Sequence, residues 1–252
     1  MTVPRIYCSE TLREAEGCEL GADNLRYLKT VLRLKPGDPI IVFDGYGHEF
    51  SARIAAFGPS RVSVLLVKPL PSALRPIRLT LAQGIPKAGK MDLIVRTAAE
   101  LGTDVIIPFT AARCVPQLDR ERAAGKVARW QKIVREAARC TRSPRLAVIE
   151  QVLPFDEMLA QAALQDRKLI FWEEEDRQTI RHVLHDARFA DAVSYFIIVG
   201  PEGGLTRDEV ARAGRAGFAS VTLGKHILKV ETAAAAILSI VQYEKGIFGR
   251  ET

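Results

Sequence analysis

Residues 197–210 read IIVGPEGGLTRDEV, and this stretch decides the fold of the second half of the chain. An apolar run leads directly into a glycine-rich turn, and Thr206, Asp208 and Glu209 then supply the signals that begin a helix. A turn of this kind commonly holds a phosphate, because glycines let backbone N–H groups approach an anion. Glu202 lies in the middle of the turn, however, and its charge would repel a phosphate.

The spacing of the glycines also excludes two phosphate-binding motifs. A Walker loop requires G-x-x-x-x-G-K-[ST] and a dinucleotide loop requires G-x-G-x-x-G, and residues 200–206 match neither. A neutral or positively charged ligand suits this turn better, and ligands of open α/β sheets bind at the carboxyl ends of the strands. A second turn, at Gly224, repeats the arrangement and leads to an apolar helix predicted for residues 231–245.

The chain separates into two predicted domains at residues 68–76, KPLPSALRP, where three prolines favour a stiff linker. Residues 1–70 contain a short helix, predicted from about residue 22 to Leu34, and strand-like runs around the hairpin signal at residues 44–47. They are predicted to form a small β-barrel-like domain. In residues 71–252, β-type runs alternate with helical stretches. This alternation predicts an α/β domain with a mostly parallel sheet covered by helices on both faces.

The composition is that of a soluble globular protein. The chain has 252 residues, of which 48% are hydrophobic and 26% charged. We expect a cytoplasmic protein without a membrane segment, because no long uncharged apolar run and no signal peptide pattern are present. The four cysteines and four histidines lack the spacing of zinc ligands, so we expect reduced thiols and no metal.

The positive charge is concentrated in one region. The net charge is +6, and residues 113–145 alone hold ten basic residues against three acidic ones. In the helix predicted for residues 119–140, Arg129, Lys132, Arg135 and Arg139 fall on the face opposite the apolar residues. This face is either an ordinary solvated surface or a contact for nucleic acid.

Seven stretches in chain order carry a resemblance to one family. They are PRIY (4–7), VLRLKPGD (31–38), FDGYGHEF (43–50), GKMDLIVRTAAELGTDVIIPFTAARC (89–114), RWQKIVREAA (129–138), GPEGGL (200–205) and LGKHILKVETA (223–233). Together they resemble the 16S rRNA (uracil-N3)-methyltransferases, which belong to the knotted SPOUT class of S-adenosylmethionine (SAM) enzymes. The resemblance covers almost the whole chain.

The resemblance implies a PUA-like N-terminal β-barrel that binds RNA, joined to a C-terminal α/β domain with a deep trefoil knot. It further implies a homodimer that uses SAM to methylate N3 of one uridine in the decoding region of 16S rRNA, in the small ribosomal subunit. The implied SAM-binding residues lie in three loops: Phe171, Trp172 and Glu173; Val199, Gly200, Pro201, Glu202, Gly203 and Gly204; and Leu223, Gly224, Ile227 and Leu228, followed by Thr232.

A sulfonium cation would explain an acidic residue in the glycine turn, since Glu202 suits a positive ligand. Loss of the N3 proton would be helped by a cation near the base. The candidates, each in a motif that resembles the family's, are Arg5, Arg33, Arg113 and Lys229. Arg129, Lys132, Arg135 and Arg142 are the expected RNA-binding residues. The chain departs from the family in having His226 and Lys229 at two positions that usually hold Arg, and Cys140 to Ser143 in place of a Gln-containing pattern.

Two alternative functions are considered. A knotted ribose 2′-O-methyltransferase typically ends in an Asn-Val-Ser-type motif, whereas this chain has KVETAAA. A non-catalytic RNA-binding protein that kept the fold would have no use for the two glycine loops.

Overall fold

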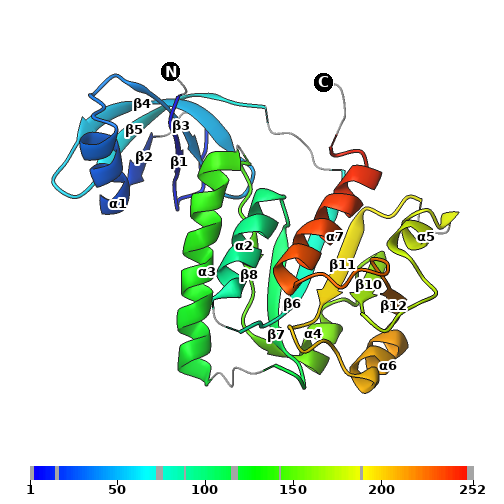
Figure 1. Cartoon of the computed structure of the whole chain (residues 1–252). Helices are drawn as coiled ribbons and strands as arrows, with labels where there is room; N and C mark the ends of the chain where they lie inside the picture. Colours follow the sequence, from blue (N-terminus) through cyan, green and yellow to red (C-terminus); the bar gives the residue numbers. More distant parts are fainter. Residues whose placement is uncertain are drawn as a thin grey trace. The chain divides into compact units, whose positions relative to one another are not determined.

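The computed structural model describes residues 3–14, 17–71, 76–87, 89–114, 119–141, 143–187 and 190–248. The chain divides into two compact units (Figure 1). The first consists of Met1–Leu74 together with Arg135–Leu146, and the second of Arg75–Val134 together with Ala147–Thr252. The first unit is therefore built from two segments that are distant in the sequence.

The first unit contains a five-stranded sheet with the order β1-β3-β4-β5-β2. Its elements are β1 (Arg5–Tyr7), β2 (Gly17–Leu20), α1 (Ala22–Arg26), the π-helical turn η1 (Tyr27–Val31), β3 (Pro39–Phe43), β4 (Glu49–Phe57) and β5 (Val62–Pro69). Strand β1 runs parallel to β3, and the other neighbours are antiparallel. Two register shifts between β4 and β5 bend the sheet. Because the described parts of β1 and β2 do not pair, the predicted barrel is an open, curled sheet.

Alternating residues of these strands form the core of the first unit. Ile40 and Val42 of β3, and Ile54 of β4, are fully buried beside Leu28 of η1. The helix predicted to continue to Leu34 ends earlier, because Arg33 adopts a left-handed conformation with φ of 55°.

The second unit contains a seven-stranded sheet in its described residues, and the order of its main path is β12-β10-β11-β6-β7-β8. The strands are β6 (Arg78–Gly84), β7 (Val105–Thr110), β8 (Val148–Ile149), β9 (Leu153–Pro154), which pairs with β7, β10 (Arg167–Phe171), β11 (Ser194–Val199) and β12 (Ala219–Val221). Every pairing is parallel. The predicted parallel sheet is confirmed, and its central strands are apolar on both faces, as buried parallel strands require.

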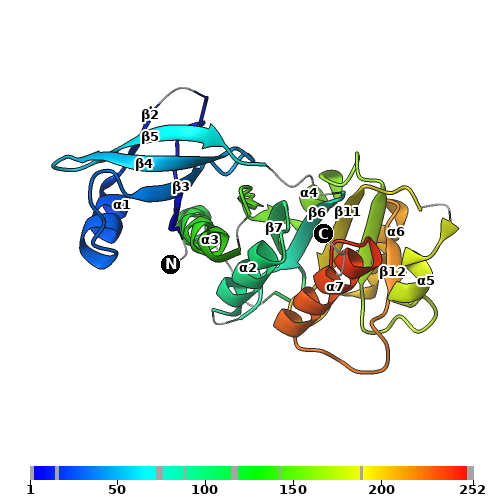
Figure 2. The same cartoon turned by 90° about the horizontal axis from the view of Figure 1, so that it is seen from above.

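Helices cover both faces of this sheet. They are α2 (Lys90–Glu100), α3 (Arg120–Thr141), α4 (Phe155–Ala160), α5 (Ile180–Leu184), α6 (Arg207–Arg215) and α7 (Val230–Glu244). Figure 2 shows α2 and α7 side by side on one face, with α4 and α6 on the other. Among the helices in the described part of the chain, none is both long and apolar enough to cross a bilayer.

The apolar face predicted for α3 is confirmed, and its basic face needs a correction. Val127, Trp130 and Val134 are buried as expected. Arg135 and Arg139 were predicted to lie on a face that is either solvated or in contact with nucleic acid, but both are half-buried. Their guanidinium groups lie over aromatic rings, Arg135 at 5.9 Å from the centroid of Tyr7 and Arg139 at 5.4 Å from that of Tyr27. Lys132 is exposed, whereas Arg129 is exposed but pairs with Asp92. Arg142 lies outside the described residues.

Candidate functional site

The strands of the second unit end level with one another at their carboxyl edge. Phe171, the last residue of β10, pairs in register with Val199 of β11 and with Val221 of β12. Val199 in turn pairs with Gln83 of β6. The loops that follow these strands therefore begin side by side, which is where ligands bind in open α/β sheets. All three predicted cofactor loops start at this edge.

The glycine loop after β11 touches the loop after β10. Gly204 adopts φ of 69°, in the left-handed region, and its N–H donates to the carbonyl of Pro201 at 2.9 Å. A Cβ atom at Gly204 would overlap the Glu173 carboxylate, because it would lie 2.8 Å from the carboxyl carbon of that side chain. Trp172 donates its indole N–H to the carbonyl of Leu205 at 3.3 Å. These contacts place two of the predicted loops against each other.

Strand β6 supports the glycine loop from the other side. A Cβ atom at Gly84 would lie 2.6 Å from Cδ and 2.7 Å from the backbone nitrogen of Pro201, so only glycine allows this approach. The buried Gln83 side chain donates its amide N–H groups to the carbonyls of Gly84 at 2.9 Å and Gly200 at 3.2 Å. Sequence reasoning missed Gln83 because nothing in its local pattern shows that β11 lies beside β6.

Glu202 is held by groups at the start of α2. Its carboxylate oxygens accept hydrogen bonds from the backbone N–H of Lys87 at 3.1 and 3.0 Å, and Oε1 lies 3.0 Å from the Lys90 ammonium nitrogen. Burial acts to raise the pKa of Glu202, but these donors outweigh it and hold the pKa below its ordinary value. The interpretation of the sequence assumed that the Glu202 carboxylate is free to face a ligand. In the structure the carboxylate is instead paired with Lys87 and Lys90.

Lys90 connects the glycine loop to the first turn of α7. Its ammonium nitrogen also lies 3.9 Å from a carboxylate oxygen of Glu231, and its pKa is raised, chiefly by the hydrogen bond to Glu202. That Glu231 oxygen is buried and accepts no hydrogen bond from the described residues. One ammonium group thus lies near two carboxylates, one from the glycine loop and one from α7. No local pattern in the sequence indicates this role of Lys90, because it depends on tertiary contact alone.

The helix start predicted after the glycine loop is confirmed. Thr206 is the N-cap of α6 and forms a capping box with Glu209. The buried Glu209 carboxylate also accepts the N–H of Ala112, after β7, at 2.8 Å. One side chain therefore fixes the start of α6 to a neighbouring loop of the same edge.

The loop after β12 presents apolar side chains to the surface. Gly224 has φ of 113°, and its N–H donates to the hydroxyl of Thr222 at 3.1 Å. Leu223 is half-buried, whereas Ile227 is 87% exposed. Leu228 and Thr232 are also exposed. Exposed aliphatic side chains at this carboxyl edge provide an apolar surface that a planar ring could cover.

The four candidate cations are divided between the two units. Arg113 donates to the carbonyl of Gly203 at 3.1 Å, and Lys229 is the exposed N-cap residue of α7. Both therefore belong to the carboxyl edge. Arg5 lies in the first unit with an 8% exposed side chain, and donates to Glu49 at 2.7 Å and to the carbonyl of Ala138 at 2.9 Å. These contacts give Arg5 a structural role.

Comparison with known proteins identifies the family. A family model described as an RNA methyltransferase domain matches residues 73–242, and one described as an RNA methyltransferase PUA domain matches residues 20–67. The ribosomal RNA small subunit methyltransferase E of Bacillus subtilis is 30% identical over 238 residues, covering 93% of each chain. That of Rickettsia conorii is 32% identical over 244 residues, covering 96% of each.

The chain belongs to the ribosomal RNA small subunit methyltransferase E family.

A solved structure of the methyltransferase E family has the same fold. The crystal structure of the enzyme from Neisseria gonorrhoeae, bound to S-adenosyl methionine, superposes with a TM-score of 0.85 at 31% identity, and the match covers 96% of this chain and 98% of that chain. The PUA match lies within the first unit, and the methyltransferase match spans the whole carboxyl edge.

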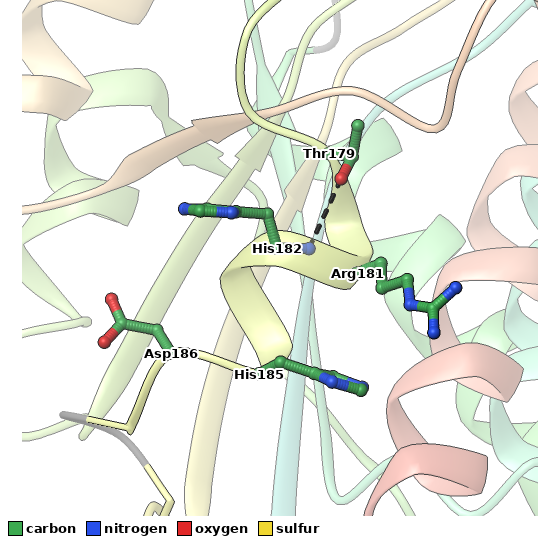
Figure 3. A pocket seen from close by; sticks show the side chains of 5 residues that line it. All are labelled: Thr179, Arg181, His182, His185 and Asp186. Atoms are coloured by element: carbon green, nitrogen blue, oxygen red, sulfur yellow. Dashed lines mark hydrogen bonds between the residues drawn. The ribbon is translucent and has the colours of Figure 1, made fainter.

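A hollow of about 600 Å³ lies on α5, and none of the residues that line it belongs to the three predicted cofactor loops. It is lined by Thr179, Arg181, His182, His185 and Asp186. Figure 3 shows that these side chains do not converge, because His182 and Asp186 point to one side of α5 and Arg181 and His185 to the other. Within the described part of the chain, no group of three or more potential metal ligands of the His, Cys, Asp and Glu types lies close together.

Proposed function

We propose that the chain methylates N3 of one uridine in the decoding region of 16S rRNA, with SAM as its cofactor. The observation that carries the proposal is the convergence of three loops at one sheet edge, with Gly204 against Glu173 and Gly84 against Pro201. We further propose that the chain acts as a cytoplasmic homodimer and that β10 to α7 form a deep trefoil knot. The placement of β10 between β11 and β12 supports such threading.

The residues of the carboxyl edge fit a sulfonium nucleoside. SAM, when bound, supplies both the methyl group and its leaving group, so the protein need supply only binding and orientation. The side chains of Leu223, Ile227 and Leu228 would cover the adenine, and the backbone of Gly203 and Gly204 would close on the ligand. Glu202 would act mainly by fixing the loop, because Lys90 already shares its charge. Correct placement of the two reactants can remove about 7 to 11 kcal/mol from a barrier.

We propose that one of two cations at the carboxyl edge acts on the uracil. Arg113 contacts the glycine loop, and Lys229 begins α7 directly after the last loop. Either would stabilise the uracil anion by donating to a carbonyl oxygen after N3 loses its proton. Arg33 is exposed and in the first unit, which suits a phosphate contact.

The activity is tested with labelled SAM and small ribosomal subunits that lack the modification. The expected product is N3-methyluridine, identified by nuclease digestion and mass spectrometry. Transfer to a ribose hydroxyl would favour the 2′-O alternative, and binding without transfer would favour a non-catalytic protein.

The SAM site is tested separately by calorimetry. Gly203→Val should abolish SAM binding, because a Cβ atom there would lie 3.0 Å from Cβ and 3.1 Å from the carbonyl oxygen of Arg113. Gly214→Ala is the matched control, since a Cβ atom at Gly214 meets no atom within 4 Å. Unchanged affinity in Gly203→Val would contradict this assignment.

We also propose that the exposed face of α3 contacts RNA through Arg129, Lys132 and Arg135. Lys132 is the most direct test, because Arg129 pairs with Asp92 and Arg135 lies over Tyr7. Lys132→Ala should lower the slope of log affinity against log salt by about 0.7 to 0.9, the value for one phosphate contact. An unaltered slope would make this face an ordinary solvated surface.

A further inference from the structure

The turn between β3 and β4, residues 44–48, is built around a buried carboxylate. Asp44 is 1% exposed, and Oδ1 accepts the backbone N–H groups of Tyr46 at 2.8 Å and His48 at 3.2 Å. Oδ2 accepts the N–H of Leu12 at 3.3 Å and lies 2.6 Å from Nδ1 of His48. These four contacts therefore fix the backbone of the turn and the imidazole of His48.

The turn presents an aromatic ring and an imidazole to solvent. Tyr46 as a whole residue is 69% exposed, and the side chain of His48 is 56% exposed. Because the Asp44 carboxylate can only accept, Nδ1 of His48 carries the hydrogen and Nε2 faces outward.

Arg145 adds a positive charge to the same turn. Its backbone bridges to Gly45 and Tyr46, and a Cβ atom at Gly47 would lie 3.1 Å from Nε of its guanidinium group. Arg145 is exposed, and no carboxylate among the described residues pairs with it. Its segment belongs to the same compact unit as the turn.

A second aromatic and cationic pair adjoins this surface. A Cβ atom at Gly45 would lie 3.3 Å from Cε2 of Tyr7, so the Tyr7 ring packs against the turn. The guanidinium carbon of Arg135 lies 5.9 Å from the centroid of that ring. Two tyrosine rings and two guanidinium groups therefore lie at or next to this turn, and proteins that bind single-stranded nucleic acids combine these groups.

We propose that Tyr46, His48 and Arg145 form a binding site for one single-stranded nucleotide of the RNA substrate. The base stacks on Tyr46, Arg145 contacts a neighbouring phosphate, and Nε2 of His48 forms a hydrogen bond with a 2′-hydroxyl or a base edge. This site, the Tyr46 platform, rests on the proposed function only in taking RNA as the ligand. It belongs to the first unit, whereas the carboxyl edge belongs to the second.

Stacking is tested by anisotropy of the full chain with a short fluorescent single-stranded RNA. Tyr46→Ala should weaken binding about 5-fold to 100-fold, the usual cost of removing a stacked aromatic ring, whereas Tyr46→Phe should bind as the wild type does. Ultraviolet crosslinking to RNA that carries 5-iodouridine should modify Tyr46. Equal affinity of Tyr46→Ala and the wild type would overturn the proposal.

The phosphate contact is tested with two matched arginines. Arg145→Ala should lower the salt slope of RNA binding by about 0.7, as expected for one phosphate of a single strand. Arg61→Ala is the control, because Arg61 is an exposed arginine at the β4–β5 turn of the same unit. Equal slopes in the two variants would remove Arg145 from the site.

Controls separate this site from folding and from methyl transfer. All variants should keep the wild-type melting temperature and SAM affinity, since none alters the Asp44 bonds or the carboxyl edge. RNA affinity that depends on Tyr46 in a protein without methyltransferase activity would refute the proposed function and leave the platform standing. Methylation of rRNA by a protein whose RNA affinity does not depend on Tyr46 would support the proposed function and refute the Tyr46 platform.

Discussion

The turn at residues 44–48 and the glycine loop at residues 200–204 both contain an acidic residue among glycines, and they use it differently. Asp44 is buried and accepts the backbone N–H groups of Tyr46 and His48, within its own turn. Glu202 is partly exposed. It accepts a hydrogen bond from the backbone N–H of Lys87 and pairs with the ammonium group of Lys90, and both residues are more than a hundred positions away in the sequence. The first acid holds its own turn, whereas the second attaches its loop to another element.

The difference indicates what each region can do. A turn fixed by its own buried carboxylate is rigid and independent of any ligand. A loop fixed by an exposed ion pair depends on screening, on pH and on the position of its partner. We therefore expect changes at Asp44 to affect folding, and changes around Glu202 to affect SAM binding.

The largest effect is expected for Asp44→Ala. Removing the acceptor leaves four donors without their partner, which should cost about 3 kcal/mol of unfolding free energy. Urea denaturation measures the loss, and Asp38→Ala is the control, because Asp38 accepts the Lys35 N–H at 2.7 Å in an exposed turn. Equal losses in both variants would show that burial does not distinguish Asp44. The SAM affinity of the folded protein should not change.

Gly84→Ala should act on the glycine loop. The new methyl group would lie 2.6 Å from Pro201, so the backbone must shift, at a cost of about 1 to 3 kcal/mol. Calorimetry should show SAM affinity reduced at least tenfold, while Gly214→Ala retains it. Wild-type affinity in Gly84→Ala would mean that the close approach of these strands is not needed for the site.

A smaller effect is expected for Lys90→Met. A partly exposed ion pair contributes little to stability, so the unfolding free energy should change little, whereas SAM affinity should fall a few-fold. Lys90→Arg should retain affinity, and exchanging the charges, with Lys90→Glu and Glu202→Lys together, should recover part of it. If neither Lys90→Arg nor the charge exchange binds SAM better than Lys90→Met, the ion pair does not hold the glycine loop in its binding conformation.

The smallest effect is a dependence on pH. Because the folded pKa of Glu202 is below its ordinary value of 4.5, the stability it contributes is fully present above that value. It is lost as the pH falls from there through the lowered pKa. The difference in unfolding free energy between the wild type and Glu202→Gln should therefore shrink in acid. A difference that stays constant with pH would contradict the assignment.

Local sequence signals predicted the helices and strands, but they could not predict contacts between residues that are distant in the sequence. The strand, turn and helix of residues 197–210 follow from apolar runs, glycines and a capping box, all of which act over a few residues. Gln83 bonds to Gly200, 117 positions away, and the bond exists only because β6 lies beside β11. Periodicity does not encode strand order, and a knot is even less visible to it.

The basic helix shows the same limit. Its spacing predicted which residues of α3 share a face, and the burial of Trp130 and Val134 agrees. Spacing could not show that Arg135 and Arg139 lie over tyrosines from the start of the chain. Arginine beside an aromatic ring is indistinguishable in sequence from arginine in water.

The division of the first unit into two segments has a consequence for synthesis. Met1–Leu74 leaves the ribosome first, but its unit also includes Arg135–Leu146. Until the second segment emerges, Arg5 lacks the Ala138 carbonyl that it binds in the finished protein. The N-terminal domain therefore cannot mature in strict order of translation. A fragment ending at residue 74 would be an incomplete domain, and expression of the RNA-binding unit alone would require residues 135–146 to be joined to it.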